Sequence, residues 1–220
     1  MKRYHIILIL FAVFSSSGYS QTEHETAWEQ KASELVKKAS EKIKDYRSME
    51  VEFTYTMENS QMDITETMSG KVYTKGDKYR MLLGDNVFIS DGKTVWNFID
   101  DLWEIHINRL ENMEGGLTPT ALLDNFETEY RGKFIRQENH KGRMVDLIDM
   151  IPVTPQSFFK YRLAIDATNQ TLVYTIAYDR HGGTYTYSID TLKPNINIDD
   201  SMFVFNRADF PESIDIIDLR

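Results

Sequence analysis

Residues 68–104, MSGKVYTKGDKYRMLLGDNVFISDGKTVWNFIDDLWE, contain four short runs of apolar and β-branched residues. The runs are separated by Lys75-Gly76-Asp77, Gly84-Asp85-Asn86 and Asp91-Gly92. Gly and Asp at these spacings favour tight turns, and Asp-Gly between alternating runs is among the strongest hairpin signals. The stretch therefore predicts four antiparallel strands, at residues 72–73, 79–83, 87–89 and 94–99.

Apolar and polar residues alternate with a period of two from Met49 through most of the chain. This alternation is typical of strands with one apolar face and one solvated face. About eleven strands at hairpin spacing predict a mainly β fold, in which one antiparallel sheet curls toward an incomplete barrel. The alternation at residues 62–72 leads into the strand at 72–73, and the remaining strands are expected at residues 51–57, 103–107, 130–137, 144–151, 158–166, 172–179 and 185–190.

The first helix is expected to begin near Thr22, which forms a capping-box pattern with Glu25. Apolar residues then recur at steps of three and four from Trp28 as far as Tyr46. Positive and negative charges are mixed on the opposite side of this helix, whereas helices that lie on membranes usually have a basic polar side. The pattern therefore favours a helix packed on the sheet over a membrane-surface helix.

A second, short helix is expected after the glycine pair at 115–116. Thr118-Pro119 supplies an N-cap and a proline in the first turn, and Leu122, Leu123 and Phe126 give the helix an apolar side. Two interpretations remain open. The helix is either a movable cover over the mouth of the sheet or a fixed closure of one barrel end.

Residues 1–20 have the pattern of a secretory signal peptide. Lys2 and Arg3 precede an apolar run at 6–14, and mostly small residues follow at 15–20. We expect cleavage before Gln21, which leaves residues 21–220 as a single domain. The apolar run is too short to span a bilayer stably, although an uncleaved anchor is the alternative.

Composition excludes several classes of function. After removal of the expected signal peptide, which contains Lys2 and Arg3, the chain has 23 basic and 34 acidic residues and a formal charge of −11. This balance repels phosphate and disfavours nucleic-acid binding. The chain has no cysteine, which excludes disulfides, cysteine-type zinc sites and thiol nucleophiles.

Nothing in the sequence predicts catalytic or metal-ligating residues. The histidines at 24, 106, 140 and 181 lack a metal-ligand spacing, and no Gly-x-Ser-x-Gly elbow is present. Asp100-Asp101 and Asp199-Asp200 resemble paired carboxylates, but both pairs lie at expected turns, where Asp accepts bonds from backbone N–H groups. We therefore expect no enzyme activity and no cofactor.

The order of three motifs resembles the outer-membrane lipoprotein carrier proteins, the LolA family. The motifs are Ser69-Gly70-Lys71-Val72-Tyr73, Lys78-Tyr79-Arg80 and Ile89-Ser90-Asp91-Gly92-Lys93-Thr94-Val95-Trp96. The family's closing pattern is similar to residues 197–205, with Phe203 and Phe205 at strand spacing, and to residues 210–216, where a proline precedes a final short strand. Gly76-Asp77 and Met81 replace the family's usual proline and tryptophan.

The resemblance implies an incomplete antiparallel barrel, covered by helices, that holds the acyl chains of lipoproteins. The protein would be a monomeric chaperone that carries lipoproteins across the periplasm from the inner to the outer membrane. An inner-membrane lipoprotein-releasing transporter would load it, and an outer-membrane receptor or the membrane itself would unload it. Transport of another lipid, such as a glycolipid or acylated pigment, and a lipid-sensing module are the alternatives; an enzyme acting on an acyl substrate is the least favoured.

Methionine and aromatic residues are the expected cavity lining, because methionine adapts to acyl chains of different shape. For any single one of them, ordinary core is the favoured interpretation, and the prediction of a lining rests on their collective surplus. Arg80 matches the position at which the family has an arginine that hydrogen-bonds the helical cover, although strand periodicity also allows an outward Arg80. The expected lining residues are Phe53, Tyr55, Met57, Met62, Met68, Tyr79, Met81, Phe88, Trp96, Phe98, Leu122, Leu123 and Phe126.

Overall fold

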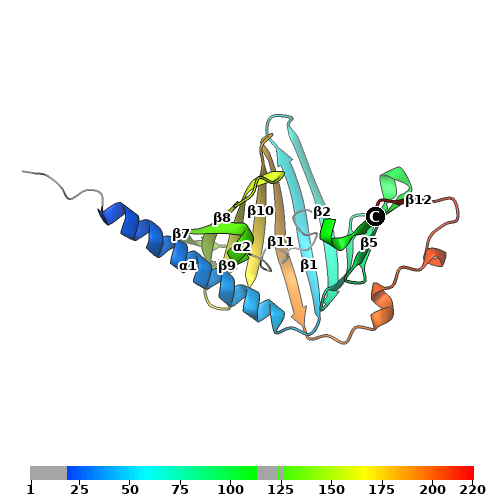
Figure 1. Ribbon diagram of the computed structural model, residues 1–220, viewed down its shortest axis with the longest axis horizontal. Helices are drawn as coiled ribbons and strands as arrows, with labels where there is room; N and C mark the ends of the chain where they lie inside the picture. Colours follow the sequence, from blue (N-terminus) through cyan, green and yellow to red (C-terminus); the bar gives the residue numbers. More distant parts are fainter. Residues whose placement is uncertain (1–18, 113–122, 124–125) are drawn as a thin grey trace, which may run out of the picture.

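The computed structural model describes residues 19–112, 123 and 126–220, without the side chains of 19–25 and 127. It contains a long helix, α1 (Tyr19–Lys44), a short helix, α2 (Phe126–Glu129), and one large sheet (Figure 1). The strands are β1 (Met49–Asn59), β2 (Ile64–Lys75), β3 (Lys78–Leu83), β4 (Asn86–Ser90), β5 (Thr94–Ile99), β6 (Glu104–Arg109), β7 (Tyr130–His140), β8 (Arg143–Pro152), β9 (Phe158–Asp166), β10 (Leu172–Asp179), β11 (Gly183–Pro194) and β12 (Asp215–Asp218).

The sheet has twelve strands in the order β12-β6-β5-β4-β3-β2-β1-β11-β10-β9-β8-β7. It is open, because β12 and β7 are its two edges. All neighbouring pairs are antiparallel except β12 and β6, which are parallel. The expected antiparallel sheet of about eleven strands is therefore corrected to a mixed sheet of twelve, in which β12 corresponds to the final short strand that the resemblance implies. Alternation in a sequence identifies a strand but carries no information about its direction, so this parallel pair was not predictable from the pattern.

The inner face of the sheet is the face on which α1 packs. Ala32, Val36 and Ala39 of α1 are fully buried, in a cluster with residues of β8 and β9 that includes Met150 and Leu163. Figure 1 shows α1 crossing the half of the sheet formed by β7–β10. The helical spacing thus places one apolar stripe on the sheet, as the sequence predicts.

The start of α1 differs from the prediction. The helix already includes Tyr19, three residues before the expected N-cap Thr22. Trp28, expected on the buried stripe, is 44% exposed, and the Lys133 ammonium lies 5.7 Å from the centre of its ring. The expected signal peptide lies mostly outside the described residues, and its cleavage site remains a prediction. Within the part of the chain that the structure describes, no helix is both long and apolar enough to cross a membrane.

The outer face of β3–β6 is covered by the C-terminal segment, residues 195–214. This segment contains two 3₁₀ turns, η4 (Asp200–Phe203) and η5 (Arg207–Asp209). Phe203 therefore ends a helical turn, and the strand expected at Phe203 and Phe205 is absent from the described structure. Phe205 stacks on Trp96 of β5, with ring centres 5.5 Å apart and planes 5° apart. The Phe-x-Phe spacing thus serves packing on the sheet instead of strand pairing.

Candidate functional site

The inner face of β1–β4 gathers most of the residues expected to line a cavity. The strand register places Phe53 opposite Gly70, Tyr55 opposite Met68, and Met81 opposite Phe88, so these side chains share one face. Val51, Val72 and Val95 complete the buried cluster on this face. The expected residues that the structure brings together here are Phe53, Tyr55, Met57, Met68, Tyr79, Met81 and Phe88.

These side chains differ in burial. Phe53 and Met81 are 1% exposed and belong to a packed core. Tyr55, Met57, Met68 and Phe88 are only half-buried although all are apolar or aromatic and lie on the inner face. This part of the inner face therefore presents apolar surface that the described residues do not fully cover.

Three expected lining residues lie elsewhere. Trp96 and Phe98 point to the outer face, where they contact Phe205 and Phe210 of the C-terminal segment. Met62 lies in the turn between β1 and β2 and is 62% exposed. The prediction was wrong for these three, because apolar residues occur on both faces of β5 and at the turn.

The second predicted helix falls mainly on residues that the structure does not describe. Thr118, Pro119 and Leu122 lie outside the described residues. Leu123 and Phe126 are buried in the cluster beneath α1, at 1% and 8% exposure. A role of this segment as a movable cover remains a prediction.

A hollow of about 320 Å³ lies between α1, α2 and the strands β7 and β8. Ser33, an exposed residue of α1, lies at its border, and the other lining residues are small or apolar. Its volume is at the lower end of the range of ligand pockets. The lining residues are Ala32, Ser33, Val36, Phe126, Tyr130, Gly132 and Met150.

Two inner-face hydroxyl groups are buried and have no hydrogen-bond partner among the described residues. They belong to Tyr79 of β3 and Thr175 of β10, which are 6% and 3% exposed. Burial raises the pKa of Tyr79 and raises the pKa of Tyr55 to about 12. A tyrosine phenol is already neutral at physiological pH, and these shifts move both groups further from ionisation. The inner face can therefore offer neutral donors to a polar atom of a ligand without offering charge.

Arg80 lies on the side of β3 opposite to Tyr79 and Met81. Its side chain is half-buried, and Nη1 donates to the backbone carbonyl of Met202 in η4 at 3.4 Å. The described contact of Arg80 is thus with the C-terminal segment on the outer face. A contact between Arg80 and residues 113–122 falls outside the described residues and remains a prediction.

Sequence reasoning missed the inner-face residues of the other half of the sheet. Tyr187 of β11 contacts both Phe53 and Tyr55, with ring centres 5.9 and 5.0 Å apart. The alternation of Tyr185, Tyr187 and Ile189 was a usable signal, because β11 is expected as a strand. Gly132 and Met150 line the hollow but carry no such signal, since their role depends on α1 lying over them.

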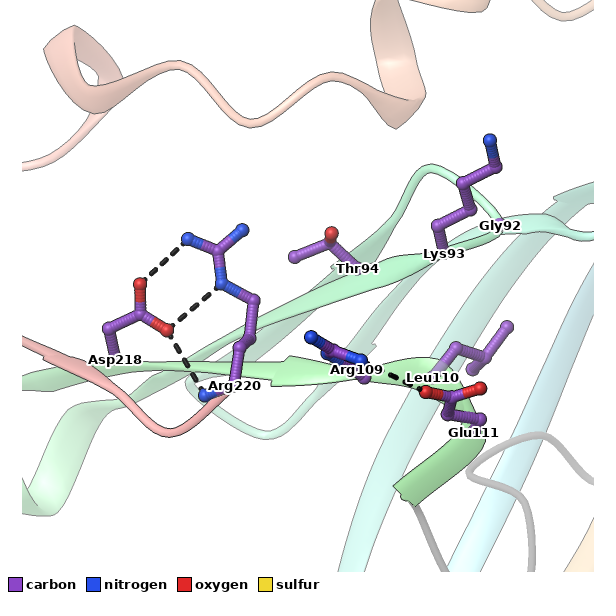
Figure 2. A pocket seen from close by; sticks show the side chains of 8 residues that line it. All are labelled: Gly92, Lys93, Thr94, Arg109, Leu110, Glu111, Asp218 and Arg220. Atoms are coloured by element: carbon purple, nitrogen blue, oxygen red, sulfur yellow. Dashed lines mark hydrogen bonds and ion pairs between the residues drawn. The ribbon is translucent and has the colours of Figure 1, made fainter.

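A second hollow, of about 810 Å³, lies at one end of β5 and β6. Figure 2 shows its eight lining residues, which come from the β4–β5 turn, the end of β6 and the residues around β12. We call it the rim groove. Its lining residues are Gly92, Lys93, Thr94, Arg109, Leu110, Glu111, Asp218 and Arg220.

The acidic pairs named from the sequence belong to turns. Asp199 accepts a hydrogen bond from the backbone N–H of Ser201, and Asp100-Asp101 form a 3₁₀ turn between β5 and β6. In the turn between β10 and β11, Asp179 accepts hydrogen bonds from the N–H groups of His181 and Gly183. Among the described residues, no group of three or more His, Asp or Glu side chains could hold a metal ion.

Several solved structures align with this chain. An uncharacterized conserved protein from Thermus thermophilus aligns with a TM-score of 0.55 and 12% identity, over 86% of this chain and 99% of that one. MucB aligns with a TM-score of 0.50 and 14% identity, over 81% and 64%. The Mycobacterium tuberculosis lipoprotein LppX aligns with a TM-score of 0.48 and 13% identity, over 77% and 99%.

No curated protein sequence matches the chain. The profile of the family described as "Outer membrane lipoprotein carrier protein LolA" matches residues 44–206. That range runs from the last residue of α1 to the loop before η5 and includes every strand except β12. The match covers well over half of the sequence, and the chain therefore belongs to the LolA family.

Proposed function

We propose that this protein is a periplasmic carrier that binds the acyl chains of lipoproteins on the inner face of its sheet. The observation that carries the proposal is the uncovered apolar surface formed by Tyr55, Met57, Met68 and Phe88, on the same face as the hollow beneath α1. A buried methylene contributes roughly 0.8 kcal/mol, so covering two or three acyl chains is worth tens of kcal/mol before ordering costs. A carrier must supply such surface without packing it into a solid core.

The buried hydroxyl groups of Tyr79 and Thr175 support this proposal. A buried donor without a partner costs about 1–3 kcal/mol. An ester or amide carbonyl of an acylated ligand would accept from such a donor and remove that cost. A neutral phenol suits a neutral carbonyl, and burial raises the pKa of Tyr79 further from the physiological range.

The family relationship supports the proposed cargo and partners. In this proposal, an inner-membrane lipoprotein-releasing transporter loads the protein. An outer-membrane receptor or the membrane itself unloads it. We propose that the protein binds its ligand without catalysing a reaction. The alternatives are transport of another lipid and a role as a sensing module. Identifying the bound molecule distinguishes them from lipoprotein transport.

Mass spectrometry of the protein purified from the periplasm tests the cargo class. Co-purified triacylated lipoproteins are the expected result. Recovery of a glycolipid or an acylated pigment instead would replace lipoprotein as the cargo. Recovery of the protein without any lipid, together with failure to bind added acylated peptide, would overturn the carrier proposal.

A matched pair of variants tests whether the hollow beneath α1 takes part. Ser33→Trp places a large side chain at the border of the hollow, whereas Gln30→Trp places the same side chain on an exposed position of α1 outside its lining. We expect Ser33→Trp to weaken binding of an acylated peptide about tenfold or more. This is the change in affinity that follows when roughly two methylene groups of the ligand are no longer buried. Equal binding by both variants would exclude the hollow from the site.

A further inference from the structure

The rim groove carries positive charge in a protein that is otherwise acidic. Lys93, Arg109 and Arg220 come from three separate segments and line one hollow (Figure 2). The whole chain has a formal net charge of −9. A cation-lined groove on such a protein is a local site to which an anion can be attracted.

The three cations are not equally available. Arg220 forms a two-pronged ion pair with Asp218, with N–O distances of 2.7 and 2.9 Å. The Arg220 guanidinium lowers the pKa of Asp218 to about 2, so this carboxylate stays ionised and neutralises Arg220. Arg220 and Asp218 therefore form one wall of the groove and leave little net charge there.

Arg109 and Lys93 are freer. Arg109 Nη1 lies 3.4 Å from the Glu111 carboxylate, and both side chains are strongly exposed, so this pair is weak. Within the described residues, no carboxylate forms an ion pair with Lys93. The five donors of a guanidinium suit a tetrahedral or planar oxyanion, and a lysine adds a point charge.

The groove also borders apolar surface. Leu110 lines the groove and packs against the inner-face cluster that contains Tyr79, Met81 and Val95. Thr94 faces Arg109 across the β5–β6 pair and adds a hydroxyl to the lining. Charged and apolar surfaces thus meet at Leu110, which is the arrangement that an anionic amphiphile requires.

We propose that the rim groove binds a phosphate group through Lys93 and Arg109. The headgroup of an anionic lipid and free inorganic phosphate share this chemistry. For a lipid, the chain passes Leu110 onto the inner face, a step that rests on the proposed carrier function. The groove would then select anionic over neutral amphiphiles.

Calorimetric binding of three probes tests the proposal: dodecyl phosphate, dodecyl maltoside below its micelle concentration, and inorganic phosphate. We expect the wild-type protein to bind dodecyl phosphate roughly three- to tenfold more tightly than the maltoside, since exposed charge pairs are weak. Lys93→Gln and Arg109→Gln should each reduce this preference, and the double variant should abolish it. High salt should reduce it as well.

Arg180→Gln is the matched control, because Arg180 is an exposed cation in the distant β10–β11 turn. It should keep the preference and the affinity for the maltoside. Equal binding of the two amphiphiles by wild type, or an equal loss of preference in Arg180→Gln, would overturn the proposal for lipid headgroups.

Inorganic phosphate separates the two sources. Phosphate binding that is lost in Lys93→Gln, without any preference between amphiphiles, would assign the groove to free phosphate. Failure of both amphiphiles to bind would count against the carrier function, while phosphate binding would still support the groove. Absence of both phosphate binding and headgroup preference would overturn the groove proposal alone.

Discussion

Gly70 is required by the aromatic ring that lies over it. A Cβ atom at this position would lie 2.2–2.8 Å from ring atoms of Phe53, which is itself 1% exposed. Because the ring cannot move without disturbing the inner-face cluster, we expect Gly70→Ala to lower the free energy of unfolding by about 1–3 kcal/mol. Urea denaturation measures this loss.

Phe53→Leu in the Gly70→Ala background provides the control. If the Phe53 ring is the obstacle, the double variant will lose less free energy of unfolding than the sum of the losses in Gly70→Ala and Phe53→Leu. The reason is that leucine leaves room for the new methyl group. Strict additivity would mean that Gly70 serves some other purpose. An unchanged unfolding midpoint in Gly70→Ala would contradict the prediction outright.

Tyr79 illustrates a conflict between stability and binding at one residue. Its buried hydroxyl group has no partner among the described residues, so Tyr79→Phe should raise the free energy of unfolding by about 1 kcal/mol. The same change should weaken binding of an acylated peptide, if the hydroxyl donates to the ligand. Tyr55→Phe, on the half-buried part of the same face, is the control. Loss of stability in Tyr79→Phe would show that the hydroxyl already has a partner in the free protein.

Asp179 makes the stability of the β10–β11 turn depend on pH. Its carboxylate accepts from the N–H groups of Gly183 and His181 and from the Tyr185 hydroxyl at 2.7–3.0 Å. The N–H of Gly183 is the main cause of the lowered pKa of Asp179, and burial opposes it. A carboxyl group whose pKa is lower in the folded state stabilises the protein above its unfolded pKa. The stabilisation is lost as the pH falls through the folded pKa.

We therefore expect Asp179→Asn to be less stable than wild type at neutral pH. The difference should shrink as the pH falls below the ordinary aspartate range near 4. Denaturation at a series of pH values measures it. A stability difference that stays constant down to pH 2 would contradict the titration of Asp179 as its cause.

The C-terminal segment is an element held mainly by side chains. Phe205 and Phe210 pack on Trp96 and Phe98, while Arg80 donates to the Met202 carbonyl. A double-mutant cycle of Trp96→Ala and Phe205→Ala should give a coupling of about 0.5–1.5 kcal/mol for the stacked pair. The control is a cycle of Trp96→Ala with Phe134→Ala, since Phe134 lies in the half of the sheet under α1. This control cycle should give no coupling energy.

The strands were predictable because their signals are local. Asp91-Gly92 and the other turn sequences fix hairpins between neighbours, and strict alternation identifies each strand from a few residues. The faces of β5 were not predictable, because Trp96 and Phe98 are half-buried against Phe205 and Phe210, which lie more than a hundred residues later in the chain. For the same reason the Phe-x-Phe spacing predicts a strand where the structure has a 3₁₀ turn that ends at Phe203.

At the scale of the whole molecule, two clusters form one continuous inner face. Ile43 of α1 and Ile189 of β11 each pack against both clusters. The half under α1 is packed apart from the hollow of about 320 Å³, whereas the half on β1–β4 keeps half-buried methionines and aromatic residues. Apolar capacity for a ligand thus lies beside a packed region that supplies stability.

An open sheet of twelve strands must avoid pairing with a second copy through its free edges. Edge strand β12 has four residues, with Asp215 and Asp218 at its ends. Edge strand β7 has eleven residues but carries a register shift between Phe134 and Arg136, and Arg131 and Arg136 are exposed. Charges and irregular pairing are the usual protection of sheet edges, so we expect a monomer.

Replacing the two exposed arginines of β7 tests this explanation. Arg131→Val with Arg136→Val leaves β-branched residues on a long free edge, which favours edge-to-edge pairing. We expect association that increases with concentration, measured by sedimentation or by light scattering after size exclusion. Arg47→Val with Arg180→Val removes the same charge from exposed positions outside the edge strands and should stay monomeric. Association of both double variants would point to lost charge in general, and association of neither would show that the bulge alone protects the edge.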